Sequence, residues 1–326
     1  MTPATPVSPP EAVLHEALAG LTTPQKTLPP WLFYDQRGSQ LFEQITALPE
    51  YYLTRTERAL FAAHADEIFL EFVSPVTIAE LGAGTAAKTG LLLQAATRLQ
   101  PEVLYQPIDV SPSALAEAAA HLTTAIPGVL VHPQVANYIT EPYTLQRPDG
   151  CRILALYIGS SIGNFSPAEA TSILRRLRSH LAPGDALLLG ADLAPGPHKS
   201  VETLLAAYND AAGITAAFNK NILAHLNREL GADFHLDAFV HRARWNAAES
   251  RIEMHLESLL PQTVHISTDG QPQRIHFTRG ETIHTENSYK FTDAALNALL
   301  ASATFTPTRT FRDPNRSFAV TLARAL

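Results

Sequence analysis

Cysteine is nearly missing from this chain of 326 residues, in which Cys151 stands alone. A single cysteine excludes an internal disulfide and a zinc site made of several thiolates. Thirteen histidines are present, but none of them follows the His-x-His or His-Glu-x-x-His spacing of metal-binding motifs. We therefore expect no metal.

Charged residues are also scarce, at 17% of the chain, and the formal net charge is −7. Binding to nucleic acid needs clustered Lys and Arg, so we expect no nucleic-acid partner. No apolar run approaches the ~18 residues of a membrane span. The first ten residues lack the basic and apolar segments of a secretion signal. We expect a cytoplasmic monomer that acts on a small molecule and has no membrane partner.

Short apolar runs alternate with helical segments in the middle of the chain. The predicted strands are 76–81, 103–109, 128–135, 152–158 and 186–190. Two of the intervening helices have clear starts, Ser111 before Pro112 and the capping box Ser166-Pro167-Ala168-Glu169. This alternation predicts an α/β fold with a doubly wound parallel sheet. A helix at 292–301 and a hairpin, 308–311 with 317–322, are expected to close the sheet.

The alternation is interrupted once. The segment 196–286 mixes helical stretches, expected at 201–212 and 222–230, with strand-like stretches. The segment 11–57 belongs to a stretch, from residue 11 to about 64, that is predicted to be all-helical. We expect these two segments to form a second, α+β lobe that binds substrate, with 58–195 and 287–326 as the main domain. Residues 1–10 include four prolines and are expected to be a disordered tail.

A glycine turn follows the first strand, in the sequence Glu80-Leu81-Gly82-Ala83-Gly84-Thr85. Ligands of open α/β sheets bind at the carboxyl ends of the strands, and glycines allow the backbone to approach a ligand closely. Asp109 ends the second strand, where its carboxylate can accept hydrogen bonds from two ribose hydroxyls. The pattern predicts a nucleoside-containing ligand; alternatively, the glycines only form a tight turn.

S-adenosylmethionine and NAD both fit, since Gly82-x-Gly84-x-x-Ala87 also matches a loose dinucleotide fingerprint. Three features favour S-adenosylmethionine. Glu80 precedes the first glycine by two residues, where it can meet the positively charged methionine end of that cofactor. The turn 181–185 and the closing hairpin suit class I methyltransferases. No His or Lys stands where a hydride-transfer acid is expected.

Longer motifs lie outside the glycine turn. They are residues 48–57 (LPEYYLTRTE), 159–164 (GSSIGN), 217–219 (AFN), 244–246 (RWN), 251–254 (RIEM) and 285–291 (TENSYKF). Together they resemble the bacterial histidine-specific Nα-methyltransferases of ergothioneine biosynthesis, over nearly the whole chain from about Trp31. The resemblance implies a class I methyltransferase with a Rossmann-like sheet. It also implies S-adenosyl-L-methionine as cofactor and trimethylation of the α-amino group of L-histidine to hercynine.

The resemblance also implies roles for single residues. Gly82, Lys88 and Asp109 match cofactor-binding positions, and Asn137 and Tyr138 match the pair that flanks the adenine. That pair is Asp-Phe in the family; an asparagine still accepts a hydrogen bond there, but without charge. The positions that match substrate-binding residues are Tyr52, Asn164, Tyr208, Met254, Glu286 and Ser288.

A histidine site of this kind needs no dedicated catalytic residue, because methyl transfer from a sulfonium depends mainly on orientation. Asn164 and Tyr208 suit the substrate carboxylate, whereas Glu286 and Ser288 suit the two ring nitrogens. Met254 matches a family residue that lines the imidazole, and the resemblance implies that Met254 and Glu286 together favour histidine over the bulkier tryptophan of fungal relatives.

The amine needs a contact of its own. The carbonyl of Gly159 is a candidate acceptor for an amine hydrogen, and we expect solvent to take the protons that are released. Tyr34 and Tyr52 offer aromatic faces to the growing ammonium group.

Other functions remain open on the residues alone. The same fold could methylate another amino acid or amine, the chain could be a nicotinamide-dependent oxidoreductase, or it could bind a ligand without turnover. In those cases Tyr52 and Met254 are ordinary core residues and Glu286 is a surface partner of Lys290.

Overall fold

Residues 9–267 and 272–326 are described by the computed structural model, in which the chain forms two units. Unit 1 consists of Met1–Tyr52 and Ser200–Ser288, and unit 2 of Leu53–Lys199 and Tyr289–Leu326. The sequence placed these boundaries at residues 57, 195 and 286. Residues 1–8 of the expected tail lie outside the described residues, and Pro9 and Pro10 already belong to the first helix.

Unit 2 is built around one sheet. Its strands are β2 (Val76–Leu81), β3 (Val103–Asp109), β4 (Val129–Val131), β5 (Gln134–Val135), β6 (Arg152–Tyr157), β7 (Ala186–Asp192), β13 (Phe305–Arg312) and β14 (Phe318–Ala325). Its helices are α3 (Tyr52–Leu70, whose first residue belongs to unit 1), α4 (Thr89–Leu99), α5 (Pro112–Ala125), a 3-10 turn (Ser161–Asn164), α6 (Pro167–Ser179) and α9 (Asp293–Ser302).

The strand order of this sheet is β13-β14-β7-β6-β2-β3-β4, with β5 also on β3. The neighbours from β7 to β4 are parallel, while β14 is antiparallel to both β7 and β13. The order therefore runs outward in both directions from β2 and β6, and the crevice outside their carboxyl ends is the ligand position of a doubly wound sheet. The predicted α/β fold class and its closing hairpin are confirmed.

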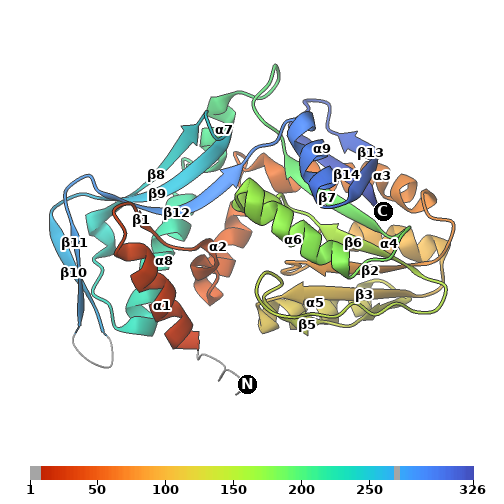
Figure 1. Ribbon diagram of the computed structural model, residues 1–326, viewed down its shortest axis with the longest axis horizontal. Coiled ribbons are helices and arrows are strands. Elements are labelled where there is room, and N and C mark those ends of the chain that lie inside the picture. The colour runs from red at the N-terminus through yellow and green to blue at the C-terminus, as the bar shows by residue number, and fades with distance from the viewer. Residues whose placement is uncertain (1–8, 268–271) are drawn as a thin grey trace. The chain divides into compact units, whose positions relative to one another are not determined.

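Helices cover both faces of the sheet. One face packs against α6 and α9, whose core residues are Ala170, Ile173, Leu174, Leu177, Leu296, Leu299 and Leu300. Figure 1 shows α6 on the near side of the sheet and α4 behind it. Because both faces are covered, β2 and β7 are buried at every residue, which explains why these strands read as continuous apolar runs in the sequence.

The predicted helix caps are confirmed. The Ser111 hydroxyl accepts the N–H of Ala114 at the start of α5, with Pro112 in the first turn. Ser166 and Glu169 form the reciprocal capping box of α6.

In its described residues, unit 1 combines helices with two small sheets. Its helices are α1 (Pro9–Leu21), a 3-10 turn (Pro30–Phe33), α2 (Gln36–Thr46), α7 (Val201–Ala207), α8 (Ile214–Leu230) and a second 3-10 turn (Leu236–Ala238). Its strands are β1 (Lys26–Thr27), β8 (Phe239–Asn246), β9 (Arg251–Ser258), β10 (Gln262–Ile266), β11 (Gln273–Phe277) and β12 (Thr282–Tyr289, whose last residue belongs to unit 2). One sheet has the order β1-β12-β9-β8, and β10 pairs with β11.

Two expectations for unit 1 were wrong. The amino-terminal segment is not all-helical, because β1 pairs in parallel with β12. The helix expected at 201–212 ends at Ala207, and α8 begins at Ile214, eight residues before its expected start. The Asp210 carboxylate accepts the N–H groups of Ile214 and Thr215 in the first turn of α8.

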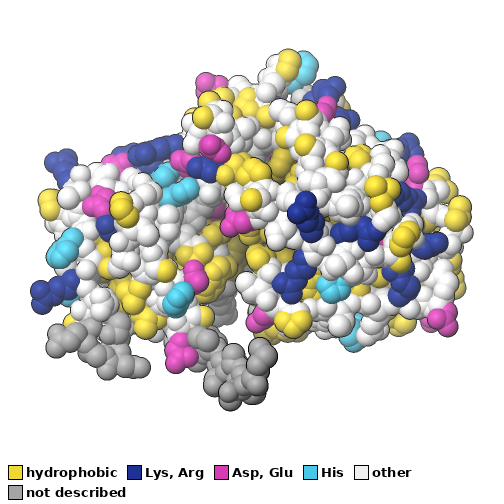
Figure 2. All heavy atoms as spheres, viewed as in Figure 1, with side chains coloured by type: hydrophobic (Ala, Val, Ile, Leu, Met, Phe, Trp, Pro, Cys, Tyr) yellow, Lys and Arg dark blue, Asp and Glu magenta, His cyan; other side chains and the backbone are white. Residues whose placement is uncertain are grey.

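Among the described residues, none of the helices has the length and apolarity that a bilayer crossing requires. Lys and Arg side chains gather over α6 in Figure 2. The guanidinium groups there are bonded to backbone carbonyls: Arg175 donates to Ser302, Arg176 to Ile139 and Arg178 to Leu181. These arginines therefore tie the helix to neighbouring segments.

Asp185, just before β7, is a buried carboxylate whose contribution to the stability of unit 2 can be measured. Its carboxylate is fully buried, pairs with Arg147 and accepts the N–H groups of Ile153 and Ala182 at 3.0 and 2.8 Å. Burial by itself raises the pKa of Asp185, but the bonds from Arg147 and from the two N–H groups outweigh it and lower the pKa. A lowered pKa stabilises the fold above about pH 4, and this contribution is lost as the pH falls through the folded-state value.

We predict that Asp185→Asn lowers the free energy of unfolding by about 3 kcal/mol at pH 7, because it leaves Arg147 unpaired. The deficit should shrink as the pH falls toward 3, since asparagine does not titrate. Urea unfolding of both proteins across this pH range measures it, and a deficit that is the same at every pH would contradict the account.

Candidate active site

The glycine turn after β2 has the backbone geometry that the sequence predicts. Gly82 and Gly84 have φ of +68° and +52°, in the left-handed region that favours glycine. No heavy atom lies within 4 Å of a Cβ built on Gly84, so the turn leaves open space beside that residue. The N–H of Gly84 donates to Asp109 at 2.9 Å, and the other carboxylate oxygen accepts the N–H of Ser111. Asp109 therefore fixes the turn, and its oxygens retain lone pairs for ribose hydroxyls.

Glu80 lies at the end of β2 and is only 2% exposed. Its Oε2 accepts hydrogen bonds from Thr89 at 2.7 Å and from the hydroxyl of Tyr105. Burial raises the pKa of Glu80 to about 7, against the opposing effect of these two bonds. The carboxylate is thus held inside unit 2, at the level of the glycine turn, and it titrates near neutral pH.

Lys88 follows the glycine turn and forms an ion pair with Glu57, a residue of α3 whose side chain is 0% exposed. Both oxygens of Glu57 accept the N–H of Gly159, at 2.8 and 2.9 Å. One buried carboxylate therefore joins the loops after β2 and β6. Sequence reasoning quoted Glu57 within a motif but gave it no role; its place two residues after Arg55 on a helix gave no sign of burial.

Tyr138 packs beside the first glycine: a Cβ on Gly82 would lie 3.5 Å from its ring. Its hydroxyl is 3.2 Å from the hydroxyl of Tyr157, and burial raises the pKa of Tyr138 to about 12. The extra hydroxyl, relative to the phenylalanine of the family pattern, thus has a partner inside the core. Asn137 uses its side-chain oxygen to accept the N–H of Ile139 at 3.0 Å.

Tyr34, one of the two aromatic candidates of unit 1, belongs to a cluster of rings. Tyr34 contacts Phe42 and Phe218 edge-on, each at 5.8 Å between centroids, and is 39% exposed. Tyr51 links Phe42 to Tyr208, at 6.4 and 6.1 Å. The predicted residue Tyr52 is the first residue of α3 and is 7% exposed.

Ser288 and Tyr208 meet in the same unit. Their hydroxyls are 2.7 Å apart, and Ser288 is 3% exposed. Glu286 stands two residues earlier on β12, so the two side chains share one face of that strand. The structure therefore brings Tyr208, Glu286 and Ser288 together around one end of β12.

Met254 lies on β9, next to β12, and is 2% exposed. Its carbonyl accepts the hydroxyl of Thr285 at 3.0 Å, and the same hydroxyl is 2.7 Å from the side-chain oxygen of Asn219. Asn219 also lies 2.8 Å from Nδ1 of His241, whose Nε2 donates to the carbonyl of Tyr208. This buried network, which sequence reasoning missed, holds both Met254 and Tyr208 in place.

Asn164 is half-buried at the end of the 3-10 turn after β6, in unit 2, five residues after Gly159. The alternative interpretation, in which Lys290 is a surface partner of Glu286, does not fit the burial of Lys290, which is 3% exposed. The Lys290 ammonium is fully buried and lies 2.9 Å from Asp192, at the end of β7.

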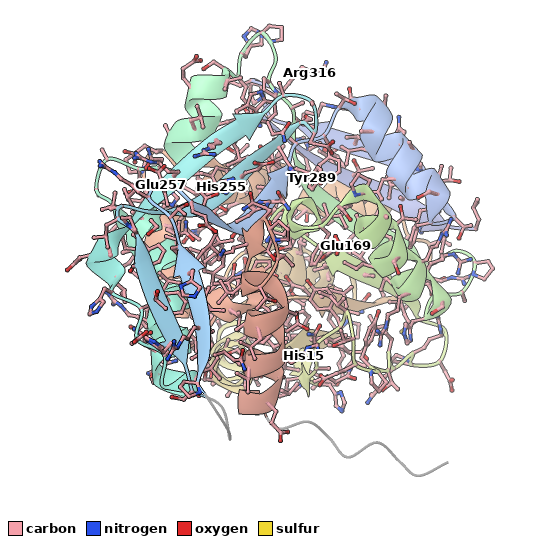
Figure 3. All side chains as sticks on the ribbon, turned by 60° about the vertical axis from the view of Figure 1, so that its left-hand side comes forward. His15, Glu169, His255, Glu257, Tyr289 and Arg316 are labelled. Carbon is pink, nitrogen blue, oxygen red and sulfur yellow. The ribbon has the colours of Figure 1, made fainter. Side chains whose placement is uncertain are left out.

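Glu253, His255 and His284 are the group in the described residues that comes nearest to a metal site, with ligand atoms within 4.8 Å of one another. His255, marked on β9 in Figure 3, lies 3.2 Å from Glu253 and stacks on His284 at 4.7 Å with 21° between the planes. A ring nitrogen binds a metal in the plane of its ring, and two nearly parallel rings do not share such a position. The arrangement gives no support to a metal centre.

Glu80 gives a test of the site's electrostatics. A carboxyl whose pKa is raised from 4.5 to about 7 stabilises the fold fully below pH 4.5, and this contribution is lost as the pH rises through 7. We predict that Glu80→Gln, which cannot ionise, gains stability relative to the wild type between pH 5 and pH 8, by on the order of 3 kcal/mol. Thermal unfolding at both pH values measures this, and parallel pH profiles of the two proteins would contradict it.

Comparison with known proteins identifies the family. A family model described as "Histidine-specific methyltransferase, SAM-dependent" matches residues 13–325. The histidine N-alpha-methyltransferase of Mycolicibacterium smegmatis is 42% identical over 96% of this chain and 95% of its own length. The enzyme of the same name from Mycobacterium tuberculosis is 39% identical over 96% and 94%. Ergothioneine biosynthesis protein 1 of Neurospora crassa is 35% identical over 63% of this chain and 23% of its own length. The chain belongs to the histidine-specific, S-adenosylmethionine-dependent methyltransferases.

Proposed function

We propose that this protein transfers three methyl groups to the α-amino nitrogen of L-histidine and forms hercynine, the first step of ergothioneine biosynthesis. The observation that carries the proposal is the grouping of Tyr208, Glu286 and Ser288 at one end of β12, beside Met254 on β9. Family membership and the names of the mycobacterial relatives support it.

The cofactor residues of the proposal are all in unit 2. They are Glu80, Gly82, Gly84, Lys88, Asp109, Asn137 and Tyr138. S-adenosyl-L-methionine supplies the methyl group of its sulfonium. The left-handed glycine turn, with open space beside Gly84, fits a ligand that approaches the backbone closely. Asp109 binds the ribose hydroxyls, and Tyr138 presents its ring beside Gly82 to one face of the adenine.

The substrate residues recognise histidine by its polar atoms. Glu286 accepts one ring N–H, and Ser288 bonds to the other ring nitrogen, which fixes the tautomer. Asn164 and Tyr208 donate to the substrate carboxylate. An amine or amino acid without an imidazole offers no ring nitrogen to Glu286 and Ser288, so it loses both hydrogen bonds, and this loss makes the site selective.

The chain contributes to methyl transfer by orienting the α-amino nitrogen of the substrate. The carbonyl of Gly159 accepts a hydrogen from the substrate amine and thereby aims its lone pair. The first two transfers each release a proton to solvent, and the third leaves a quaternary ammonium. Tyr34 and Tyr52 place aromatic faces toward that cation, a favourable contact for a group that cannot donate hydrogen bonds.

Mass spectrometry tests the reaction directly. With S-adenosylmethionine and all twenty amino acids present together, we predict that histidine gains three methyl groups and the others gain none. A gain on a different amino acid would keep the methyltransferase assignment and overturn the histidine site. A change in reduced-nicotinamide absorbance, or cofactor binding without any turnover, would support one of the other function classes.

Glu286→Gln tests the selectivity. Losing the charged acceptor should lower kcat/KM for histidine by about tenfold or more, because a bond to a charged group contributes roughly 1.5–3 kcal/mol. Cofactor affinity should stay within about twofold. The matched control is Glu257→Gln on β9, a carboxylate of the same sheet that pairs with Arg242 at 3.0 Å. Equal losses in both variants would contradict the assignment of Glu286.

A monomeric state and a cytoplasmic location belong to the same proposal. Light scattering of the purified protein during size-exclusion chromatography decides the first, and fractionation of the producing cells decides the second.

A further inference from the structure

Glu57 is a fully buried carboxylate to which the proposed function gives no part. It extends from α3 and meets three groups from the carboxyl edge of the sheet: the N–H of Gly159, the ammonium of Lys88 and the backbone of Gly190 on β7. The first two are the amine contact and a cofactor residue of the proposed function. Glu57 therefore contacts one residue that is proposed to bind the substrate amine and one that is proposed to bind the cofactor.

The sheet leaves a space that this carboxylate occupies. A Cβ on Gly190 would lie 2.0 Å from Oε1 of Glu57, so any other residue at position 190 would displace the carboxylate. Gly190 is the one glycine of β7, and every residue of this strand is buried. The absence of a side chain at this one position of β7 is explained by the carboxylate that lies over it.

The loop that Glu57 holds has an unusual backbone. Gly159 and Ser160 have φ of +79° and +59°, and a left-handed serine persists only where its surroundings determine it. Here the Ser160 hydroxyl accepts the N–H of Asp192 at 2.9 Å, and Glu57 accepts the preceding N–H with both oxygens. These bonds hold the Gly159 N–H and the Ser160 side chain, the groups on either side of the Gly159 carbonyl.

We propose that Glu57 is a positioning residue for methyl transfer: it aims the Gly159 carbonyl at the substrate amine and holds the Lys88 ammonium for the cofactor. The proposal rests on the proposed function, which assigns those two contacts. A charged acceptor is needed because an N–H and an ammonium converge on it. An amide in its place has one acceptor oxygen and turns its NH₂ toward one of these donors.

Glu57→Gln separates positioning from stability when it is compared with Asp185→Asn. Asp185 is matched to Glu57: it is a fully buried carboxylate of the same unit that pairs with one cation and accepts backbone N–H groups. It lies at the amino end of β7, away from the glycine turn and from Gly159. Both variants should lower the unfolding temperature.

Only Glu57→Gln should change the reaction. We expect its dissociation constant for S-adenosylmethionine, measured by calorimetry without histidine, to rise at least about tenfold, and kcat for histidine to fall at least about tenfold, because a small misplacement of reacting groups costs up to about a hundredfold in rate. Asp185→Asn should stay within about twofold of the wild type in both. A Glu57→Gln protein that matches Asp185→Asn in both quantities overturns the proposal.

Glu57→Asp keeps the proposal testable if the glutamine variant does not fold. Aspartate retains the charge that faces Lys88 but is one methylene shorter, so it loses the hold on Gly159. We expect cofactor affinity to be largely kept while kcat falls, and wild-type kcat in this variant overturns the proposal. If the wild-type protein itself does not methylate histidine, the proposed function fails, whereas the cofactor titrations still decide whether Glu57 holds Lys88.

Discussion

Charge buried at the carboxyl edge of the sheet is the constraint on which the rest of unit 2 depends. Glu57, Glu80 and Asp192 are 0–2% exposed, and each needs partners because an unpaired charge in the interior is very unfavourable. Glu80 is satisfied by Tyr105 and Thr89, and Asp192 by Lys199 and Lys290. Glu80 and Asp192 thus tie the ends of β2 and β7 to other segments of unit 2, and Glu57 joins the loops after β2 and β6.

Three buried polar side chains of unit 1 also need partners, but these groups are neutral. Asn219, His241 and Thr285 are buried and bonded in a chain that ends at the carbonyls of Tyr208 and Met254. Burial lowers the pKa of His241, so this imidazole is neutral at physiological pH. A network of this kind holds side chains in one arrangement without burying a charge.

The sheet of unit 2 could be predicted because its strands are buried on both faces and its turns carry caps and glycines that the chain itself encodes. β12 could not: Thr282–Tyr289 reads as a polar segment, since its stability comes from pairing with β9 and β1 rather than from an apolar run. The start of α8 was missed because Asp210, which accepts the N–H of Ile214, lies four residues upstream of it, and because the first turn of α8 contains a β-branched pair.

Some residues of the candidate site could likewise be predicted from local sequence patterns, and others could not. Gly82, Gly84 and Asp109 follow from strand ends and glycine geometry, whereas Tyr208, Met254 and Ser288 came only from a family resemblance, because their meeting depends on tertiary packing. Glu57 and Asn219 lay inside quoted motifs and still had no predicted role. What makes them important is burial and partners more than sixty residues away in the sequence, such as Gly159 and Thr285, which no local pattern records.

The position of the methyl groups on the product tests the central claim most directly. The protein is given histidine and a cofactor that carries a ¹³C-labelled methyl group. Heteronuclear NMR of the product then reports which nitrogen carries the labelled methyl groups. The account predicts one resonance from three equivalent methyl groups that correlate with the α-proton. Labelled methyl groups that correlate with the ring protons would contradict it, because Glu286 and Ser288 would then not be holding the imidazole.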